Sequence, residues 1–353
     1  MNSHSEDTDG HSTNGRRPAE QGGTVTVDLL IIGAGPVGLY GAYYAGVRGL
    51  RTAVVDSLPE LGGQVTAMYP EKLIFDIAGF PQVRGRELVT ALTAQAATAD
   101  PVYLLGQFAE SLHRDDTDRL LVTTNLGTEI DCGAIVITAG IGTFTPRALP
   151  AGEDYLGRGL AYFVPDPLSY TGTDVVVVGG GDSAVDWALT LEPVAASVTL
   201  VHRRTAFRAH AATVAALHSS RVEVITDAQV TALDGGQAVT HAEITAKGRA
   251  PQRIPCQRVV AALGFLANLG PLRDWGLELH DNRHIVVDSA MRTTTPGVFA
   301  AGDVVDYDGK VRLISVGFGE VATAINNAAV HLDPATPLFP GHSTDEQPAT
   351  AAA

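Results

Sequence analysis

The chain alternates short apolar runs with longer stretches rich in small residues, a pattern typical of buried parallel strands separated by helices. Residues 27–32 and 52–55 are apolar runs with many branched side chains, and residues 38–49 between them have the length of a helix. The order strand, helix, strand predicts one βαβ unit, in which both strands lie in the same parallel sheet.

The same order returns in the middle of the chain. Apolar runs at 175–178 and 198–201 flank a helical stretch at 183–191, and the two units have the same length. Two further strands are expected at 134–138 and 259–263, each followed by a glycine turn. The chain is therefore predicted to contain an internal repeat, with one βαβ unit in each half.

The first unit carries a GxGxxG loop between its strand and its helix. In such a loop Gly33 permits a tight turn, Gly35 lets the backbone approach a pyrophosphate, and Gly38 lets helix and strand pack closely. Pro36 opens the helix, whose N-terminus favours negative charge. Asp56 ends the second strand, where a carboxylate accepts hydrogen bonds from ribose hydroxyls. These features together predict a dinucleotide site.

The second unit carries a related loop, but its second strand ends differently. The loop and the start of its helix contain Gly179, Gly181, Asp182, Ser183 and Ala184. His202 stands where the first unit has an acid, and it is followed by Arg203, Arg204 and Arg208. Guanidinium groups bind a 2′-phosphate that a carboxylate would repel, so this site is predicted to prefer NADP over NAD. A solvated basic patch is the alternative.

Composition narrows the class of protein. A chain of 353 residues is long enough for two domains, and 38 glycines with 18% charged residues suit α/β domains. A net charge of −15 argues against nucleic-acid binding. The sequence contains no apolar run long enough to span a membrane and no apolar secretion-signal core, so a cytoplasmic protein is expected. Residues 1–23 and 343–353 are predicted to be flexible tails.

Cysteine and histidine usage points away from metal or thiol chemistry. Cys132 and Cys256 are the two cysteines, and they form no CxxC pair. The spacing of His202, His210 and His218 matches no metal site. No metal, disulfide framework or dithiol redox centre is expected.

Longer stretches of the sequence resemble a known family. They read SLPELGGQVTAMYPEKLIFDIAGFP, YFVPDPLSYTGTDVVVVGGGDSAVDWALTLEP, VHRRTAFRAH, AAGDVVDYDGKVRLISVGFGE and FPGHST. Over residues 24–343 the chain is similar to the ferredoxin-NADP reductases built on the thioredoxin reductase scaffold, the type 2 enzymes. The resemblance implies an α/β fold of two Rossmann-like three-layer ββα domains. It places FAD in a domain of residues 24–141 plus 268–342 and NADPH in residues 142–267.

The resemblance also implies which residues contact FAD. Tyr69 is expected on one face of the flavin and His342 on the other, on its own or on a partner chain's flavin. The remaining FAD contacts implied are Gly63, Gln64, Gly302, Asp303, Gly319, Glu320 and Ser343. Residues 317–320 would precede a helix at 321–331 and point its positive end at the flavin pyrimidine. From the residues alone, Tyr69 is an ordinary half-buried tyrosine and residues 317–320 are a plain helix start.

The activity implied is electron transfer from NADPH to ferredoxin. Related thioredoxin reductases have a CxxC pair where residues 162–165 here read Tyr-Phe-Val-Pro, so the flavin itself must serve the acceptor. The expected reaction is hydride transfer to flavin N5 and release of single electrons, without an acid-base residue. The resemblance also implies a homodimer. The alternatives that stay open are flavodoxin as partner, another acceptor such as a quinone or flavoprotein, an oxidase, and a flavin redox sensor without turnover.

Two further expectations concern motion and docking. Glycine-containing crossings at 140–142 and 264–268 are predicted to act as hinges between the domains. An acidic ferredoxin would dock on a locally basic surface, for which the sequence offers Arg84, Arg86, Arg147 and Arg158. Ordinary solvated arginines are the alternative.

Overall fold

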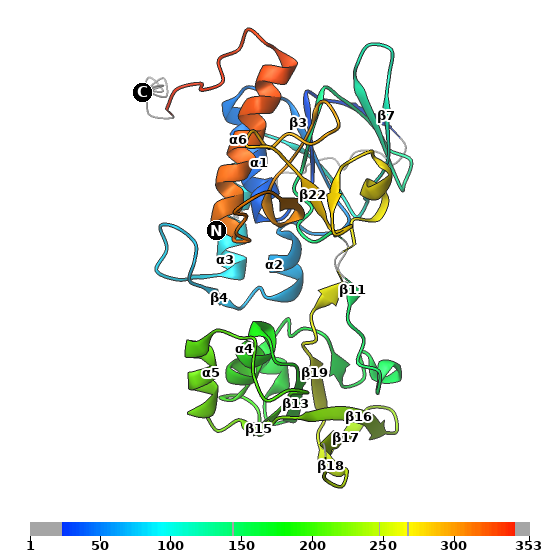
Figure 1. Ribbon diagram of the computed structural model, residues 1–353, viewed down its shortest axis with the longest axis vertical. Coiled ribbons are helices and arrows are strands. Elements are labelled where there is room, and N and C mark those ends of the chain that lie inside the picture. The colour runs from blue at the N-terminus through cyan, green and yellow to red at the C-terminus, as the bar shows by residue number, and fades with distance from the viewer. Residues whose placement is uncertain (1–22, 143–144, 247, 267, 343–353) are drawn as a thin grey trace, which may run out of the picture.

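Two stacked α/β domains make up the computed structural model, which describes residues 23–142, 145–246, 248–266 and 268–342. The larger domain holds both ends of the described chain, and the smaller domain is inserted between them (Figure 1). Among the described residues, no helix combines the length and the apolar character needed to cross a bilayer.

A parallel sheet of five strands forms the centre of the larger domain. All four residues of β2, Leu29–Ile32, are buried, as expected for a parallel strand that is covered on both faces. The strand was predicted to begin at residue 27, but the Val27 amide donates to the Asp131 carbonyl in a different sheet. The order is β23 (Val298–Ala300), β10 (Ala134–Ile137), β2, β3 (Thr52–Asp56), β6 (Val102–Leu105).

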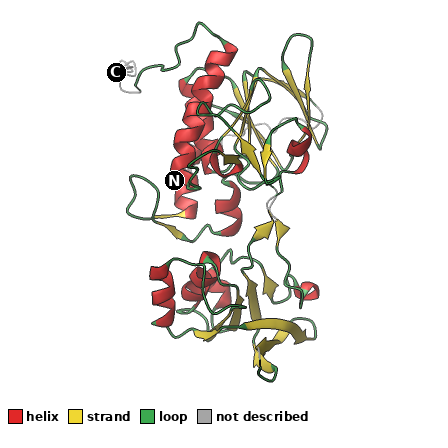
Figure 2. Ribbon diagram, viewed as in Figure 1, coloured by secondary structure: helices red, strands yellow, loops and turns green. Residues whose placement is uncertain are grey.

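Helices cover one face of this sheet and a second sheet covers the other, which gives three ββα layers (Figures 1 and 2). Pro36 opens the first helix because its fixed φ suits the first helical turn. The helices are α1 (Pro36–Val47), α3 (Gly85–Ala97) and α6 (Ile314–Leu332). The second sheet contains β1 (Thr24–Thr26), β9 (Glu129–Cys132), β8 (Leu120–Thr124) and β7 (Ala109–Arg114).

The smaller domain repeats this architecture and confirms the predicted internal repeat. Its parallel sheet runs β12 (Leu160–Ala161), β19 (Arg258–Ala261), β13 (Asp174–Val178), β14 (Ser197–Val201), β15 (Glu223–Ile225). Helices α4 (Asp182–Leu191) and α5 (Ala211–His218) cover one face, and β16 (Ala228–Gly235), β17 (Val239–Ala246) and β18 (Gln252–Pro255) form the second sheet. Alternate β13 residues divide between the two faces: Val175 and Val177 pack toward α4, Val176 and Val178 toward the second sheet.

Two antiparallel segments connect the domains. Strand β11 (Thr145–Pro146) pairs with β20 (Phe265–Leu266), and next to them Gly142 forms a bridge with Asn268. Gly142 has φ of +74°, and a Cβ there would lie 2.0 Å from the Asn268 carbonyl oxygen. The two crossings are therefore in direct backbone contact where the chain enters and leaves the smaller domain.

Helix α6 differs from its prediction. It was expected at residues 321–331 and begins seven residues earlier, at Ile314. Gly317 and Gly319 made this stretch read as a loop, but Gly317 is buried in the first turns, where a Cβ would lie 2.5 Å from Val37 Cγ2. The glycine permits close helix packing instead of ending the helix.

Short elements complete the structure. They are α2 (Gly63–Met68), β4 (Leu73–Ile74), β5 (Val83–Arg84), β21 (Leu279–His280), β22 (His284–Val286), β24 (Val305–Asp306), and the 3-10 helices η1 (Glu153–Tyr155), η2 (Pro167–Tyr170), η3 (Gly270–Asp274) and η4 (Gly302–Val304).

Candidate dinucleotide sites

The first glycine loop lies at the carboxyl end of β2 and has no room for side chains at two positions. A Cβ on Gly33, whose φ is +111°, would lie 2.6 Å from the Thr138 carbonyl oxygen. A Cβ on Gly38 would lie 1.8 Å from the Gly33 carbonyl oxygen, whereas one on Gly35 would meet nothing within 4 Å. The loop is thus closed toward the protein and open on the side of Gly35, where a phosphate group can approach.

Asp56 lies at the end of β3 and holds this loop. Its Oδ2 accepts a hydrogen bond from the Ala34 amide at 2.6 Å, and its Oδ1 accepts one from the Leu58 amide at 2.8 Å. Burial raises the pKa of the Asp56 carboxyl, and the two amides oppose that shift. Each oxygen has a second lone pair, so Asp56 can also accept from a ribose.

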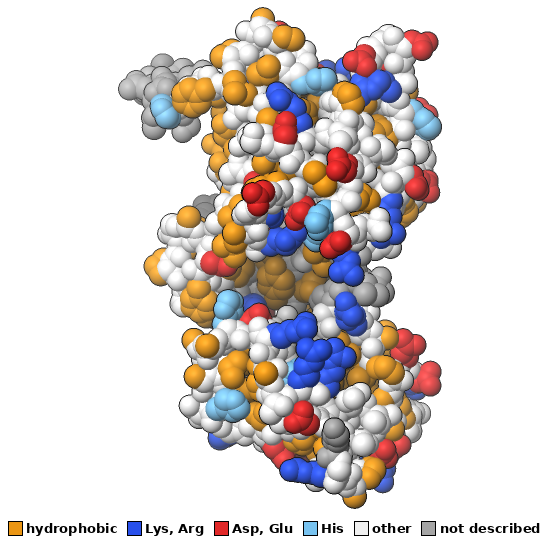
Figure 3. Space-filling model, in the orientation of Figure 1, with side chains coloured by type: hydrophobic (Ala, Val, Ile, Leu, Met, Phe, Trp, Pro, Cys, Tyr) orange, Lys and Arg blue, Asp and Glu red, His pale blue; other side chains and the backbone are white. Residues whose placement is uncertain are grey.

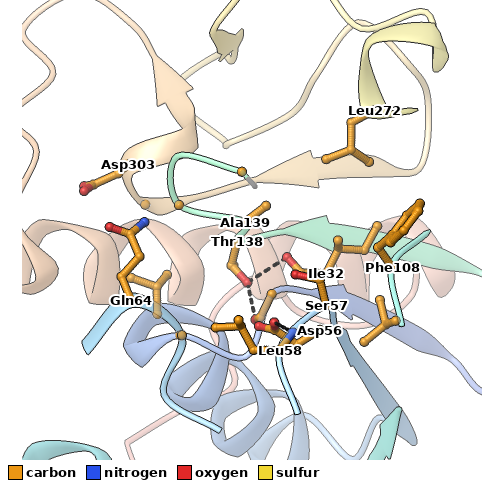
Figure 4. A pocket seen from close by; sticks show the side chains of 18 of the residues that line it. Ile32, Asp56, Ser57, Leu58, Gln64, Phe108, Thr138, Ala139, Leu272 and Asp303 are labelled. Carbon is orange, nitrogen blue, oxygen red and sulfur yellow. Dashed lines mark hydrogen bonds between the residues drawn. The ribbon is translucent and has the colours of Figure 1, made fainter. Parts of the chain in front are cut away.

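A cleft of about 410 Å³ begins at this loop. Figure 4 shows Gln64 and Asp303 at one end of it, Phe108 and Leu272 at the other, and Asp56 between them. The structure brings nine predicted residues together in its lining: Gly33, Gly35, Pro36, Asp56, Gly63, Gln64, Tyr69, Gly302 and Asp303. Gly38 lies beneath the loop and supports it.

Several other residues line the cleft that the sequence did not single out as contacts. Phe108 precedes β7, Leu272 belongs to η3, and Ile314 begins α6. Thr138 donates a hydrogen bond to the Gly33 carbonyl at 2.8 Å and so connects β10 to the loop. The TAG turn after β10 was a usable signal for Thr138, but the other three come from unrelated parts of the chain.

Tyr69 stands between the cleft and the smaller domain. Its ring lines the cleft and packs against the apolar clusters of both domains. Burial raises the pKa of the Tyr69 hydroxyl to about 12, and the negative charges of Asp303 and Asp76 contribute to the rise. An aromatic face at this end of the cleft suits a flat ring system.

The helix predicted to follow Gly319 and Glu320 begins before them. Both residues lie inside α6, and already the Gly317 amide donates to the Leu313 carbonyl within the helix. The first helical residue, Ile314, lines the cleft, so the positive end of α6 faces the cleft several residues earlier than predicted. The Glu320 side chain is buried and points toward Gly302.

His342 does not lie at the cleft of its own chain. It is exposed in the segment after α6, where its ring centroid lies 5.1 Å from that of Phe339. Arg48, at the C-terminal end of α1, binds the Pro337 carbonyl in this segment at 2.9 Å. The cleft adjoins the opposite ends of α1 and α6. Ser343 lies outside the described residues.

The second glycine loop follows β13 and has the same closed and open sides. A Cβ on Gly179 would lie 2.4 Å from the Ala262 carbonyl oxygen, and one on Gly181 would meet nothing within 4 Å. Ala184 is fully buried and replaces the third glycine of the first loop. Asp182 accepts a hydrogen bond from the His210 amide at 2.9 Å, and Ser183 next to it in α4 is exposed.

His202 supports this loop from beneath. It is only 8% exposed, its ring stacks on Phe207 with centroids 5.1 Å apart, and its Nε2 lies 3.1 Å from the Ala206 carbonyl oxygen. The ring lies against Gly180, where a Cβ would be 2.1 Å from His202 Cε1. His202, predicted to contact NADPH, is therefore placed to hold the loop that would do so.

The predicted arginines lie in the segment that follows β14. Arg203, Arg204 and Arg208 are all exposed, and the Arg208 amide donates to the Gly180 carbonyl at 2.8 Å. Lys and Arg side chains gather on the smaller domain beside the hollow between the domains (Figure 3). Such a surface favours a phosphate-bearing ligand.

The described residues offer neither a metal site nor a reactive thiol. No group of three or more His, Cys, Asp and Glu side chains in this part of the chain is arranged to hold a metal. Cys132 and Cys256 are both buried, and burial raises the pKa of each thiol to about 12. Thiolate chemistry at neutral pH is therefore suppressed.

Comparison with known proteins identifies the family. Residues 27–328 match the family model described as pyridine nucleotide-disulphide oxidoreductase. The chain belongs to this family. Within the family, a relative from Salinispora tropica named Ferredoxin--NADP reductase is 62% identical over 320 residues, covering 91% of this chain and 99% of the relative. A relative of the same name from Nocardioides sp. is 61% identical over 324 residues, covering 91% and 98%.

The fold of this oxidoreductase family member also matches a solved structure. The thioredoxin reductase of T. acidophilum superimposes with a TM-score of 0.75 at 27% identity, covering 88% of this chain and 99% of that protein. The match confirms the thioredoxin reductase-like architecture of two Rossmann-like domains. Together with the relatives, it confirms the resemblance to type 2 ferredoxin-NADP reductases.

The residues of the first cleft fit FAD. The space above Gly35 admits a pyrophosphate, Asp56 lies where a ribose is bound in such folds, and Tyr69 offers a ring face at the far end. The open side of Gly181 and the exposed arginines fit a phosphorylated dinucleotide in the same way.

We predict that Gly180→Ala destabilises the protein and weakens NADP⁺ binding at least tenfold. The added Cβ would collide with the His202 ring, which is wedged between Gly180 and Phe207. Overpacking of this kind costs about 2 kcal/mol. Thermal unfolding and calorimetric titration with NADP⁺ measure the two effects.

Gly181→Ala is the matched control. Its backbone is extended and its Cβ position is empty, so the thermal midpoint should be unchanged while NADP⁺ binding weakens. A Gly180→Ala variant with wild-type stability would show that His202 does not hold the loop.

Proposed function

We propose that this chain is a ferredoxin-NADP reductase, a FAD-dependent oxidoreductase that transfers electrons between NADPH and ferredoxin. The observation that carries the proposal is the pair of glycine loops on one chain, one followed by Asp56 and the other by exposed arginines. The relatives of the same name, at about 60% identity over nearly their whole length, support it. FAD and NADP(H) are the cofactors.

The two cofactors are assigned to different domains. Residues 24–141 and 268–342 form the FAD domain, with the cleft at Gly35, and residues 142–267 form the NADPH domain, with the loop at Gly181. The assignment is supported by the residue that follows each loop, because Asp56 suits an unmodified ribose and Arg203 suits a 2′-phosphate.

The chain's own residues explain why the flavin must serve the acceptor directly. Bound FAD accepts a hydride and releases electrons singly, which links NADPH to a one-electron carrier. Tyr69 lines the cleft at the end nearest the smaller domain, and the positive end of α6 favours negative charge there. Both cysteines are buried and protonated at neutral pH, so no thiol relays the electrons.

The arginines suggested for ferredoxin docking are mostly engaged elsewhere. Arg84 and Arg86 both pair with Glu71, at 3.6 and 2.8 Å, and Arg158 donates to the Asp154 carbonyl. All four arginines are exposed, and the Arg147 amide donates to the Gly264 carbonyl at the crossing between the domains. The competing functions are a reductase with a quinone or a flavoprotein such as flavodoxin as acceptor, an oxidase, and a sensor without turnover. Acceptor dependence separates them.

The position of His342 favours a homodimer in which this segment reaches a second chain. The 19 residues of α6 separate its ends by roughly 28 Å at 1.5 Å per residue, and the cleft adjoins only the N-terminal end. The segment after α6 exposes two large apolar side chains, Leu338 at 53% and Phe339 at 62%. Both the exposed side chains and the outward course of the segment suit contact with a partner.

Hinge motion between the domains is part of the proposal. Lys72 of the larger domain forms an ion pair with Asp186 of α4, and Tyr69 packs against the same helix layer. In this arrangement Tyr69 separates the cleft from the smaller domain. A dinucleotide on the second loop therefore needs the domains to move about the crossings at Gly142 and Gly264 before it can reach the cleft.

One prediction of this function concerns the acceptor. The FAD-loaded protein should reduce cytochrome c with NADPH only when ferredoxin is added, and NADH should support less than one-tenth of that rate. Ferredoxin-independent turnover would favour the general reductase or oxidase, and flavin reduction without turnover would favour the sensor. Activity on thioredoxin and a disulfide would contradict the absence of a dithiol.

Another prediction concerns the preference for NADPH over NADH, and it is tested with one arginine variant and a matched control. Arg203→Gln with Arg204→Gln should raise the KM for NADPH at least tenfold and leave that for NADH unchanged, because only NADPH carries the 2′-phosphate. Arg253→Gln removes an exposed arginine of β18 that pairs with Asp234, and it should change neither value.

A further prediction concerns domain motion. Lys72→Cys with Asp186→Cys, bridged by a reducible bifunctional maleimide, should retain FAD but be reduced by NADPH at under one-tenth of the normal rate. Cleaving the bridge should restore the rate, and Lys72→Cys labelled alone should not lose it. The native thiols are buried, so labelling is confined to the new ones. A bridged protein with normal flavin reduction contradicts the proposed motion.

The last prediction of this function concerns assembly. Sedimentation velocity at micromolar concentration should give twice the mass of one chain. Phe339→Ala with His342→Ala should alter the flavin absorbance spectrum of the dimer, because these rings are proposed to approach a partner's cleft. A monomer, or a dimer with an unaltered spectrum, contradicts the proposed crossing of this segment.

A further inference from the structure

A buried ion pair lies directly behind the FAD cleft. The side chain of Lys310 is 2% exposed and that of Glu320 is 5% exposed, and their charged atoms are in direct contact. Lys310 belongs to the turn after β24, and Glu320 lies in the second turn of α6. Neither side chain lines the cleft, so neither is placed to contact a bound cofactor.

Glu320 joins three separate segments of the chain. Its Oε2 accepts a hydrogen bond from the Gly302 amide at 2.8 Å, and its Oε1 accepts one from the Tyr307 hydroxyl at 2.6 Å and contacts Lys310 Nζ. All three partners donate, which is the pattern of a carboxylate. The side chain thus connects α6 both to η4 and to the turn between Tyr307 and Lys310.

Stability alone is a weak explanation for this pair. Two charges lose their hydration on burial, and replacing a buried ion pair by apolar side chains is often neutral or stabilising. What the pair does hold is the backbone of Gly302, next to Asp303 at the end of the cleft. Gly302 has φ of +84° and a Cβ there would lie 3.4 Å from Val37, so the turn is seated against the first glycine loop.

The charges behind the turn also act on Asp303. Burial raises the pKa of the Asp303 carboxyl, while the nearby cations Lys310 and Arg312 lower it and Glu320 raises it. Figure 4 shows the Asp303 side chain extending at the same end of the cleft as Gln64. The position and the ionisation of Asp303 therefore both depend on what is buried behind it.

We propose that Glu320 is a positioning residue of the FAD site: paired with Lys310, its buried carboxylate fixes the Gly302 amide and so the turn that presents Asp303 to the cofactor. This proposal rests on FAD occupying the cleft, as proposed above. It replaces the contact first expected for Glu320 with an action through the backbone of η4. The essential feature is an acceptor for the Gly302 amide, and the charge of that acceptor is secondary.

Two triple variants separate the acceptor from the charge. Both carry Lys310→Met and Tyr307→Phe, so that no buried cation or hydroxyl is left without its partner. The first adds Glu320→Gln, whose carbonyl oxygen still accepts from the Gly302 amide. The second adds Glu320→Leu, which has a similar volume and no acceptor. The readouts are thermal unfolding, the Kd for FAD, and amide exchange of the η4 peptide in the FAD-free protein.

The Gln variant should bind FAD within about threefold of the wild type and keep the slow exchange of η4. The Leu variant should unfold at a similar temperature to the Gln variant, yet bind FAD at least tenfold more weakly and exchange the η4 amides at least tenfold faster. Peptides from β2 and β10 should exchange alike in both variants.

Equal FAD affinity and equal η4 exchange in the two triple variants would overturn the proposal. So would an increase in exchange spread evenly over the larger domain, because that would indicate a general loss of stability. If the wild-type protein itself fails to bind FAD, the proposed function fails. If it binds FAD and the two variants do not differ, only the role of Glu320 fails.

Discussion

The contact between the carboxyl ends of β2 and β10 is the constraint on which the larger domain depends. At this point a Cβ on Gly33 would strike the Thr138 carbonyl oxygen, and a Cβ on Gly38 would strike the Gly33 carbonyl oxygen. The chain can turn from strand to helix here only without side chains, and Thr138 secures the turn through the Gly33 carbonyl. The tight turn directs the N-terminus of α1 into the cleft, and Asp56, η4 and α6 are arranged around the resulting space.

The smaller domain meets the same constraint with different residues. Gly179 approaches Ala262 as Gly33 approaches Thr138, and the third glycine is replaced by the buried Ala184. In the first loop a carboxylate, Asp56, holds the Ala34 amide, whereas in the second the ring of His202 lies against Gly180. The His202 ring thus packs against the second loop where the first loop has a carboxylate. The second strand of this unit therefore ends without the carboxylate that would repel a 2′-phosphate next to Arg203 and Arg204.

Close packing around the glycines also explains where the sequence misled. Gly317 and Gly319 suggested a loop, yet α6 runs through both, because Gly317 must be small where the helix meets Val37 and Gly302. The same packing draws Glu320 toward the Gly302 amide and away from the cleft. Lys72 and Asp186 gave no local signal at all, since each reads as an ordinary surface charge until the two domains are brought together.

The sequence by itself determined the features that depend on neighbours along the chain. These are the two βαβ units, the glycine turns, the acid at Asp56 and the basic run at Arg203, because strand period, turn geometry and loop spacing are local properties. Only the tertiary structure decided which distant segments complete each site. Phe108, Leu272 and Ile314 line the cleft because sheet order and helix packing bring them there, and the chain spacing between them carries no sign of it. The tertiary structure also decided where His342 lies. The length of α6 and the hydrogen bond from Arg48 to the Pro337 carbonyl place the segment after α6 on the side of the domain away from the cleft.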